Sequence, residues 1–341
     1  MDERPHIGPP PGRPKAGSSA SGAVLRRAVH GVLLLDKPLG LSSNTALQKV
    51  KRLYRAEKAG HTGTLDPLAT GLLPLCFGAA TKFAQVSLEA NKRYLATLKL
   101  GVTTTTADAE GEVIERREVH VTREQLQAAC ARFVGAIDQV PPMHSALKRD
   151  GRPLYEYARA GVAVEREPRR VTLHHIEVVD TGRDNEWTID VQCSKGTYIR
   201  TLAEDIGAAL GCGAHLAALR RTGSGALSLQ NALTLERLTD MSEAERDAAL
   251  LAADALVADW PLVRLDSDEA GRFLSGLRRR VPLADATNVR VYGPEPRAFL
   301  GAGHIAAGEL ISTRLLSPLE VQGLLSNPAN RSPLPKTTTP S

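Results

Sequence analysis

One stretch of the chain concentrates residue types that can do chemistry without help from a cofactor. It is GHTGTLDPLATGLLPLCFGAATKFAQ, residues 60–85, with a single histidine, His61, and one Asp-Pro pair, Asp66-Pro67, ahead of an apolar run. It contains no Gly-Lys-Ser/Thr ending, Gly-x-Gly-x-x-Gly run, His-Glu-x-x-His pair or calcium-loop pattern, so nucleotide-phosphate and metal sites are not indicated. The pattern alone favours Asp66 as a helix N-cap with Pro67 at the first helical position.

The same stretch resembles the catalytic motif of a known enzyme family. Residues 60–71, GHTGTLDPLATG, are similar to the catalytic motif of the TruB family of tRNA pseudouridine synthases. Further motifs of that family occur in the family's order: Asp36-Lys37-Pro38 with Gly40 and Ser42-Ser43-Asn44, Lys92-Arg93-Tyr94, Gln139-Val140-Pro141-Pro142 with Ser145-Ala146-Leu147-Lys148 and Gly151, and Cys193 to Leu202. The resemblance implies that the chain isomerises the uridine at tRNA position 55, in the T-loop, with no cofactor and no metal.

The resemblance assigns the main chemical role to Asp66, as a carboxylate that attacks the sugar or uracil or stabilises positive charge at C1′. A lone carboxylate in an apolar pocket tends to protonate, so it needs a cationic partner, and the resemblance nominates Arg200. Without the resemblance, Arg200 is interpreted as a solvated helix residue. Tyr198 and Arg200 share a face only where the chain is extended, so we expect them at a strand-to-helix junction.

Four other residues have a structural and a functional interpretation. Tyr94 is either a core tyrosine or the ring that stacks on the target uracil and takes part in proton transfer as a third catalytic residue. His61 is either a turn residue or, as in the family, a substrate-binding group that helps to displace the nucleotide from its stack. Lys37 is expected to support the pocket, and Lys148 to bind RNA phosphates; with Tyr198 they complete the expected substrate-binding set.

The elements that must position these residues alternate between strand and helix. Alternation of apolar residues or a capped amphipathic pattern predicts strands at 31–37, 92–100 and 187–194, a helix capped by Ser43 or Asn44 and running through Leu53, and a helix at 197–211. This is a mixed α/β (α+β) pattern rather than a strict parallel repeat. The family's fold, implied by resemblance, is a central, largely antiparallel sheet flanked by helices, plus a small β-rich PUA-like domain.

The chain divides into four parts on composition and resemblance. Residues 1–28 and 326–341 are Pro-, Gly- and Ser-rich and predict disordered tails. Residues 29–258 are expected to form the catalytic domain, with a basic, RNA-gripping insertion at about 142–170, and residues 259–325 the PUA-like domain. The run LSGLRRRV, residues 274–281, is either a patch for an acceptor stem or merely solvated.

Composition sets the remaining expectations. The net charge is +5 and the pI near 9.1, which only weakly favours a polyanionic partner. Four widely spaced cysteines form no Cys-x-x-Cys pair, and no run is long and apolar enough for a signal peptide or a membrane span, so we expect a cytoplasmic protein with reduced thiols. The expected partner is the T-arm of tRNA, with no membrane, no obligate protein partner and a monomeric state.

Two alternatives remain at this point. The first is a pseudouridine synthase directed by a separate guide RNA; such relatives generally have longer basic tails, whereas this C-terminal tail has only Arg331 and Lys336. The second is a tRNA-binding folding chaperone without essential catalysis, against which the joint presence of Asp66, Tyr94 and Arg200 argues.

Overall fold

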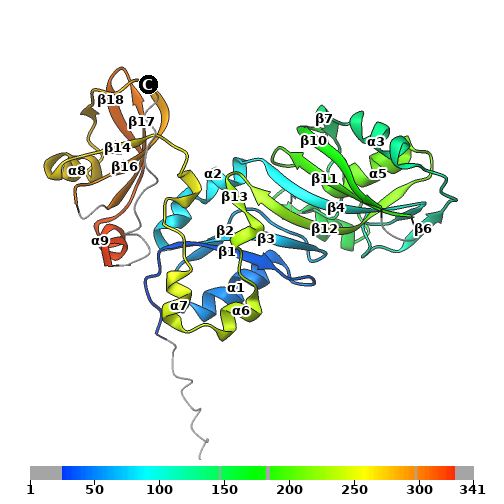
Figure 1. Ribbon diagram of the computed structural model, residues 1–341, viewed down its shortest axis with the longest axis horizontal. Helices are drawn as coiled ribbons and strands as arrows, with labels where there is room; N and C mark the ends of the chain where they lie inside the picture. Colours follow the sequence, from blue (N-terminus) through cyan, green and yellow to red (C-terminus); the bar gives the residue numbers. More distant parts are fainter. Residues whose placement is uncertain (1–24, 146, 182–184, 296–297, 327–341) are drawn as a thin grey trace, which may run out of the picture.

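The computed structural model describes residues 25–145, 147–181, 185–295 and 298–326 (Figure 1). A nine-stranded sheet forms the body of the molecule, in the order β1-β3-β12-β4-β11-β10-β7, with β2 beside β3 and β13 beside β12. All its pairs are antiparallel except β3 with β12. The strands are β1 (Gly31–Lys37), β2 (Ala59–His61), β3 (Ala69–Phe77), β4 (Lys92–Leu100), β7 (Gly135–Gln139), β10 (Arg169–Thr181), β11 (Glu186–Cys193), β12 (Ala214–Ser224) and β13 (Leu227–Ser228).

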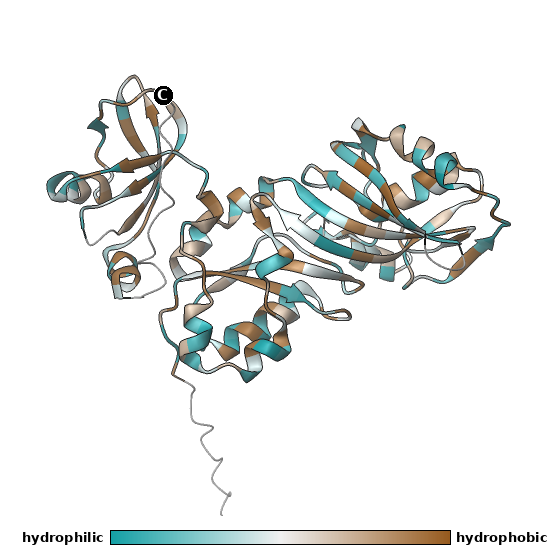
Figure 2. Ribbon diagram, in the orientation of Figure 1, coloured by the Kyte–Doolittle hydropathy of each residue, from teal (hydrophilic) through white to brown (hydrophobic). Residues whose placement is uncertain are grey.

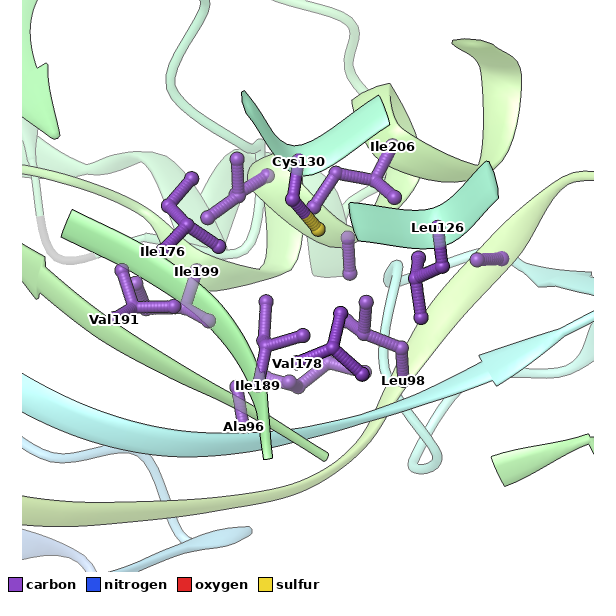
Figure 3. Close-up of a cluster of buried hydrophobic side chains, with 14 of the residues drawn as sticks. Ala96, Leu98, Leu126, Cys130, Ile176, Val178, Ile189, Val191, Ile199 and Ile206 are labelled. Atoms are coloured by element: carbon purple, nitrogen blue, oxygen red, sulfur yellow. The ribbon is translucent and has the colours of Figure 1, made fainter. Parts of the chain in front are cut away.

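Helices cover the sheet in two groups. At one end, α3 (Arg123–Ala131) and α5 (Ile199–Ala209) pack on β4, β10 and β11; Figure 3 shows Leu126 and Cys130 of α3 facing Val178 and Ile189 across a buried apolar layer. At the other end, β1 and β3 are covered by the second group and its connecting turns: α1 (Ser43–Leu53), η1 (Gly78–Phe83), α2 (Ala84–Glu89), η2 (Leu229–Asn231), α6 (Leu235–Asp240), α7 (Glu243–Ala248) and η3 (Ala255–Val257). Burial of three apolar clusters, one at the first end and one on each face of β1 and β3, is the main force that holds the sheet and helices together.

The C-terminal part is a small β-rich unit with a five-stranded sheet in the order β14-β16-β17-β18-β15. Its elements are β14 (Leu262–Arg264), α8 (Ser267–Leu274), β15 (Arg279–Arg280), β16 (Ala286–Tyr292), β17 (Phe299–Ala306), β18 (Glu309–Leu315) and α9 (Pro318–Ser326). β1 and β17, one in each part, are mainly brown (hydrophobic) in Figure 2, whereas α7 is mainly teal. One buried cluster joins the two parts, because Phe83 contacts Phe299 with ring centroids 5.2 Å apart.

The short elements outside these sheets are two hairpins and a helix. β5 (Val102–Thr104) pairs with β6 (Val113–Arg116), and β8 (Lys148–Arg149) pairs with β9 (Arg152–Pro153) ahead of α4 (Leu154–Arg159). The second hairpin and α4 occupy the predicted basic insertion. Leu154 donates its backbone N–H to the Leu147 carbonyl at 2.7 Å, which connects the start of α4 to the residue just before β8.

The mixed α/β fold is confirmed, and two helix starts need correction. The N-cap of α1 is Ser42, whose side chain accepts from the Thr45 N–H, rather than Ser43 or Asn44. Asp66 is not a helix N-cap: its carbonyl accepts from the Ala69 N–H at 3.0 Å in a turn, and β3 begins at Ala69. The helix interpretation failed because the apolar run after Asp66 is a buried strand, and a short apolar run has no period that separates the two.

Most of the predicted tails, residues 1–24 and 327–341, lies outside the described residues. Within the described part, Arg27 belongs to the folded body: its N–H donates to the Arg55 carbonyl at 2.9 Å, and its guanidinium pairs with Asp247 at 2.6 Å. Ser326 ends α9. The folded part of the chain therefore extends slightly beyond both predicted limits.

Three further properties concern the described residues only. The helices there are neither long nor apolar enough for a membrane crossing. No group of three or more His, Cys, Asp and Glu side chains is placed there to hold a metal ion. The four cysteines are buried free thiols.

Candidate active site

A cavity of about 340 Å³ opens where β3, β4, β12 and the start of α5 meet. The turn that carries Asp66 forms one side, and the residues between β11 and α5 form the other. Ser145 and Leu147, which precede β8, complete the lining. The lining residues are Gly63, Thr64, Leu65, Asp66, Ala69, Leu88, Lys92, Tyr94, Ser145, Leu147, Ser194, Lys195, Gly196, Thr197, Tyr198, Ile199, Arg200, Leu219 and Arg221. Five of the motifs found in the sequence contribute to this region or to the loops that hold it.

Asp66 and Arg200 form an ion pair at this cavity, with 2.9 Å between Asp66 Oδ2 and Arg200 Nη2. The side chain of Asp66 is 47% exposed, whereas that of Arg200 is 7% exposed. A second carboxylate, Asp108, lies 3.4 Å from Arg200 Nη1 and is buried, and Arg200 Nη2 also donates to the His144 carbonyl at 2.7 Å. Asp108 and the His144 carbonyl thus fix the guanidinium on its buried side, and the guanidinium holds the accessible carboxylate of Asp66 at the cavity. The interpretation of Arg200 as a solvated residue is therefore wrong.

The turn with Asp66 is held by the first residue of α1 and by the loop before it. Ser43 Oγ accepts from the Leu65 N–H at 2.7 Å and donates to the Leu65 carbonyl at 3.0 Å. The Gly40 N–H donates to the Pro67 carbonyl at 2.9 Å. These bonds connect the first motif of the sequence to the catalytic motif and restrict the position of Asp66.

Lys37 stabilises the loop between β1 and α1 through hydrogen bonds to its backbone. Its side chain is fully buried and donates to the carbonyls of Pro38 and Leu41 at 2.9 and 2.6 Å. Burial lowers the pKa of Lys37 to about 8, and the nearby charge of Asp66 opposes that shift. Lys37 is not among the residues that line the cavity, so the structure places it as a support of the Asp66 loop rather than at the surface that meets a ligand.

Gly71, the last residue of the catalytic motif, allows β3 to approach β12. Its φ is +97°, and a Cβ at this position would lie 2.3 Å from the Arg221 carbonyl oxygen. Only glycine fits such an approach without strain. The close contact brings β12 against β3 in parallel, with Arg221 opposite Gly71.

Tyr94 and Arg221 are direct cross-strand partners on β4 and β12. Tyr94 is half-buried and lines the cavity, with Ala96, Leu98 and Leu100 continuing the same face of β4 into the core, as predicted. Burial raises the pKa of the Tyr94 hydroxyl, and the charge of Arg221 is the largest influence in the opposite direction. The structure therefore places Tyr94 at the cavity beside a buried cation.

Tyr198 lies at the junction before α5, as expected, with extended backbone angles (φ −98°, ψ 108°). The Gln139 side chain accepts from the Tyr198 N–H at 3.0 Å and donates to its carbonyl at 3.3 Å, which ties the Gln-Val-Pro-Pro motif to this junction. Arg200, two residues later, lies in the first turn of α5. Both side chains line the cavity.

The remaining two predicted site residues do not line the cavity. His61 ends β2, half-buried; burial lowers its pKa, and its Nδ1 is buried without a hydrogen-bond partner among the described residues. Lys148 lies exposed on β8, next to the lining residue Leu147. The run at 274–281 is partly neutralised, because Arg279 pairs with Glu269 and Arg278 lies 3.6 Å from Glu309.

Three charged residues of the site were missed in the sequence. Asp108 lies in a polar loop whose Thr and Asp residues look solvated, and Arg221 lies in the run LRRTGS on a strand with little alternation. Lys92 was noted only as a neighbour of Tyr94, yet its buried Nζ donates to the carbonyls of Ser87, Leu88 and Ala90. Of the three, only Lys92 could have been found from the sequence, because the alternation of the strand places it on the same face as Tyr94.

Sequence comparisons cover almost all of the folded part. The model described as TruB family pseudouridylate synthase (N terminal domain) matches residues 51–199, that of the tRNA pseudouridylate synthase B C-terminal domain 200–258, and that of pseudouridine synthase II TruB, C-terminal, 261–316. tRNA pseudouridine synthase B of Verminephrobacter eiseniae is 58% identical over 314 residues, 90% of this chain and 95% of that protein. The namesake from Ralstonia pickettii is 63% identical over 273 residues, 79% of this chain and 86% of that protein.

Solved structures show the same fold. A chain in the crystal structure of a Cbf5-Nop10-Gar1 complex matches with a TM-score of 0.64 at 26% identity, over 84% of both chains. A chain in the structure of an H/ACA RNP bound to a substrate RNA containing 2′-deoxyuridine matches with a TM-score of 0.65 at 23% identity, over 88% of both chains, and shows the fold alone. Together with the identities above, these matches make the chain a member of the TruB family of pseudouridine synthases.

Proposed function

We propose that this chain converts uridine to pseudouridine at position 55, in the T-loop of tRNA, without a cofactor and with Asp66 as the catalytic carboxylate. The names of its relatives support tRNA as the substrate. The observation that carries the catalytic assignment is the Asp66–Arg200 pair, in which a half-exposed carboxylate faces the cavity while its cation is buried. A carboxylate held in this way is accessible and has a cationic partner, as nucleophilic or charge-stabilising catalysis requires.

The reaction is balanced without any added reagent. The N1–C1′ bond breaks, the uracil rotates, and a C5–C1′ bond forms; the proton lost from C5 is balanced by the proton gained at N1. Asp66 attacks the sugar or uracil, or stabilises positive charge that develops at C1′. Arg200 holds Asp66, and Asp108 holds Arg200 from the buried side.

The cavity fits a single flipped-out base better than a duplex. Its volume of about 340 Å³ lies at the low end of small-ligand pockets. We assign Tyr94 to stacking and proton transfer, and Tyr198 to the wall of the base pocket. His61, which lies outside the lining, is assigned to the space that the extruded nucleotide leaves, where a side chain offsets part of the unstacking cost. Lys148 is assigned to phosphate contacts of the T-arm.

The domain limits follow the same assignment. Residues 29–258 are proposed as the catalytic domain, with the insertion at 142–170, and residues 259–325 as a PUA-like RNA-binding domain. The limit near residue 259 falls between η3 and β14, where the nine-stranded sheet has ended and the five-stranded sheet begins. We further propose a monomer that acts without an obligate protein partner.

The test is direct mapping of pseudouridine in a transcribed tRNA after incubation with purified protein and no other component. We expect one new pseudouridine, at position 55, and none with Asp66→Asn. A tRNA with cytidine at position 55 is the matched substrate control. Modification at another position would refute the T-loop assignment, and full activity of Asp66→Asn would refute the catalytic one.

The same assay separates the two alternatives. A guide-dependent enzyme would be inactive until a guide RNA is added, whereas we expect full activity without one. A chaperone without essential catalysis would refold a misfolded tRNA and leave no pseudouridine in it. Measuring tRNA refolding with wild-type protein and with Asp66→Asn separates that activity from isomerisation.

A further inference from the structure

Arg221 is one of the largest fully buried side chains of the protein, and it lies in the wall of the catalytic cavity. It is 1% exposed. Its Nε donates to the Leu72 carbonyl at 2.7 Å and its Nη2 to the Gly63 carbonyl at 3.2 Å. Arg221 therefore connects β3 with the loop that precedes Asp66, while its own strand places it directly opposite Tyr94.

The buried charge of Arg221 has no acidic partner within ion-pair distance among the described residues. The other deeply buried arginines do: Arg200 pairs with Asp66 and Asp108, and Arg290 with Asp254. Burying a cation without a counter-charge is unfavourable, so a structural role alone would be served better by an apolar residue of similar volume. This cost indicates that the positive charge itself has a use at the cavity.

The titratable groups near Arg221 indicate what its positive charge does at the cavity. Lys37 on β1, His61 on β2 and Lys92 on β4 are other bases near Arg221, and their pKa values are lowered mainly by burial and also by its charge. Tyr94 is the neighbour that gains from a cation, because its oxygen can carry a negative charge, and a guanidinium stabilises such a charge through charge-assisted hydrogen bonds.

Resting on the function proposed above, we propose that Arg221 is a positioning residue for Tyr94. Its guanidinium fixes the Tyr94 hydroxyl relative to the Asp66 loop and balances the charge on the Tyr94 oxygen during proton transfer. In that step Tyr94 gives its proton to N1 of the detached uracil and takes the proton that leaves C5, so it ends as it began. Between the two transfers its oxygen is negative, and Arg221 faces it.

The first test is a double-mutant cycle on the single-turnover rate of tRNA isomerisation, with Arg221→Gln, Tyr94→Phe and the double variant. Removal of a preorganised charge is expected to lower the rate about 10²-fold in the wild-type background. With Tyr94→Phe already present, the further loss should stay within about twofold, the range in which no interaction is left to remove. Equal losses in both backgrounds would overturn the proposal.

The second test makes the charge titratable. Burial lowers the pKa of Lys37 and Lys92 to about 8, and a lysine introduced by Arg221→Lys lies among the same groups. Burial lowers the pKa of such a lysine, whereas the guanidinium of Arg221 stays charged, so the ratio of variant to wild-type rate should fall as the pH rises. The ratio cancels titrations common to both proteins, including that of His61. In the Tyr94→Phe background the ratio should be flat.

A structural role alone predicts a different result, namely a ratio independent of pH in both backgrounds, and that outcome would also overturn the proposal. The pH test remains available if Arg221→Gln does not fold. Arg220→Lys is the matched control, since Arg220 is the adjacent, partly exposed arginine on β12 and pairs with Asp36 at 2.6 Å. If wild-type protein does not modify tRNA, the proposed function is wrong. This result is obtained before any variant is compared, so it is distinguished from a failure of the proposal on Arg221.

Discussion

Two arginine–aspartate pairs in this protein have the same geometry and opposite surroundings. Asp66 and Arg200 lie 2.9 Å apart at the cavity, and Asp254 and Arg290 lie 2.9 Å apart where the C-terminal part meets the rest of the chain. The carboxylate of Asp66 is 47% exposed, whereas that of Asp254 is 5% exposed. Both arginines are buried. Arg200 also has a second carboxylate partner, Asp108, but the main difference between the pairs is the exposure of Asp66 and Asp254.

The carboxylate of Asp254 is buried and accepts from two side chains, Arg290 and Tyr292. Tyr292 donates its hydroxyl to Asp254 Oδ2 at 2.7 Å, and Arg290 Nε donates to the Trp260 carbonyl at 3.0 Å. Burial, followed by the charge of Asp254, raises the pKa of Tyr292 and keeps its hydroxyl protonated. This pair connects the segment after η3 to β16, so it serves the junction between the two parts. The pair at the cavity leaves its carboxylate available, which is what chemistry requires.

The strongest test of this comparison is Asp66→Asn. The change keeps the shape of the side chain and removes its charge, and loss of a catalytic group lowers rates by about 10⁴-fold or more. We expect isomerisation to fall to that extent while the melting temperature changes little, because Asp66 is half-exposed. Single-turnover rates and thermal unfolding measure the two effects. A rate near that of wild type would remove Asp66 from the mechanism.

Asp254→Asn should give the opposite result. Loss of the charge leaves Arg290 buried without its partner, which typically destabilises a protein by about 3–5 kcal/mol. We expect the loss in denaturant unfolding, while the folded enzyme retains its turnover. Asp247→Asn is the control, because its pair with Arg27 is partly exposed and such pairs contribute about 1 kcal/mol or less. A large loss of turnover in folded Asp254→Asn would mean that the junction shapes the active site.

The tyrosines sharpen the contrast at a smaller scale. Tyr94→Phe keeps the ring and removes the hydroxyl, so tRNA binding should survive while turnover falls about 10²-fold or more. Tyr292→Phe should leave turnover unchanged and lower stability by about 1–3 kcal/mol, because Asp254 loses a buried donor. Rates at saturating tRNA, binding affinity and unfolding separate these outcomes. Equal rates for Tyr94→Phe and wild type would reduce Tyr94 to a packing residue.

The sequence predicted the parts of the site that lie in continuous motifs. Strands 31–37 and 92–100 have the predicted bounds, and Asp66, Tyr94, Tyr198 and Arg200 meet at one cavity. The strand predictions are confirmed because local alternation fixes a strand face, and the four residues could be found in the sequence because each motif carries its residue types together. The role of each residue in catalysis remains a prediction.

The residues that were missed depend on contacts between distant segments. Arg221 reaches the cavity only because β12 lies between β3 and β4, and Gly71 allows the close approach. Asp108 reaches Arg200 only because its loop forms a bridge with Leu216 of β12. Neither pairing leaves a local pattern in the sequence. The same holds for the core that Phe83 and Phe299 share, which joins parts that composition treats as separate units.

The smallest expected effect on stability concerns the exposed charges of the insertion, which lie outside the catalytic cavity. In the insertion, Arg152 pairs with Glu156 and both side chains are about half exposed, whereas Lys148 and Arg149 are exposed neighbours on β8. Neutralising all three with glutamine should change stability by less than about 1 kcal/mol, because exposed pairs contribute little. Binding should respond more. Each lost phosphate contact lowers the slope of log affinity against log salt by about 0.7–0.9.

We expect the slope to become smaller by about 1.5, which corresponds to two phosphate contacts rather than three. Arg152 already pairs with Glu156, so Lys148 and Arg149 are expected to make most of the phosphate contacts. The rate at saturating tRNA should stay near that of wild type, because a contact that is equal in ground and transition states affects affinity alone. Leu147 lines the cavity and accepts the Leu154 N–H, so the hairpin can place its charges beside a bound T-arm. Neutralising three exposed cations elsewhere controls for net charge: Arg116 on β6, Arg132 at the end of α3 and Lys49 on α1. A slope that falls equally in both sets would show that the insertion makes no specific grip on RNA.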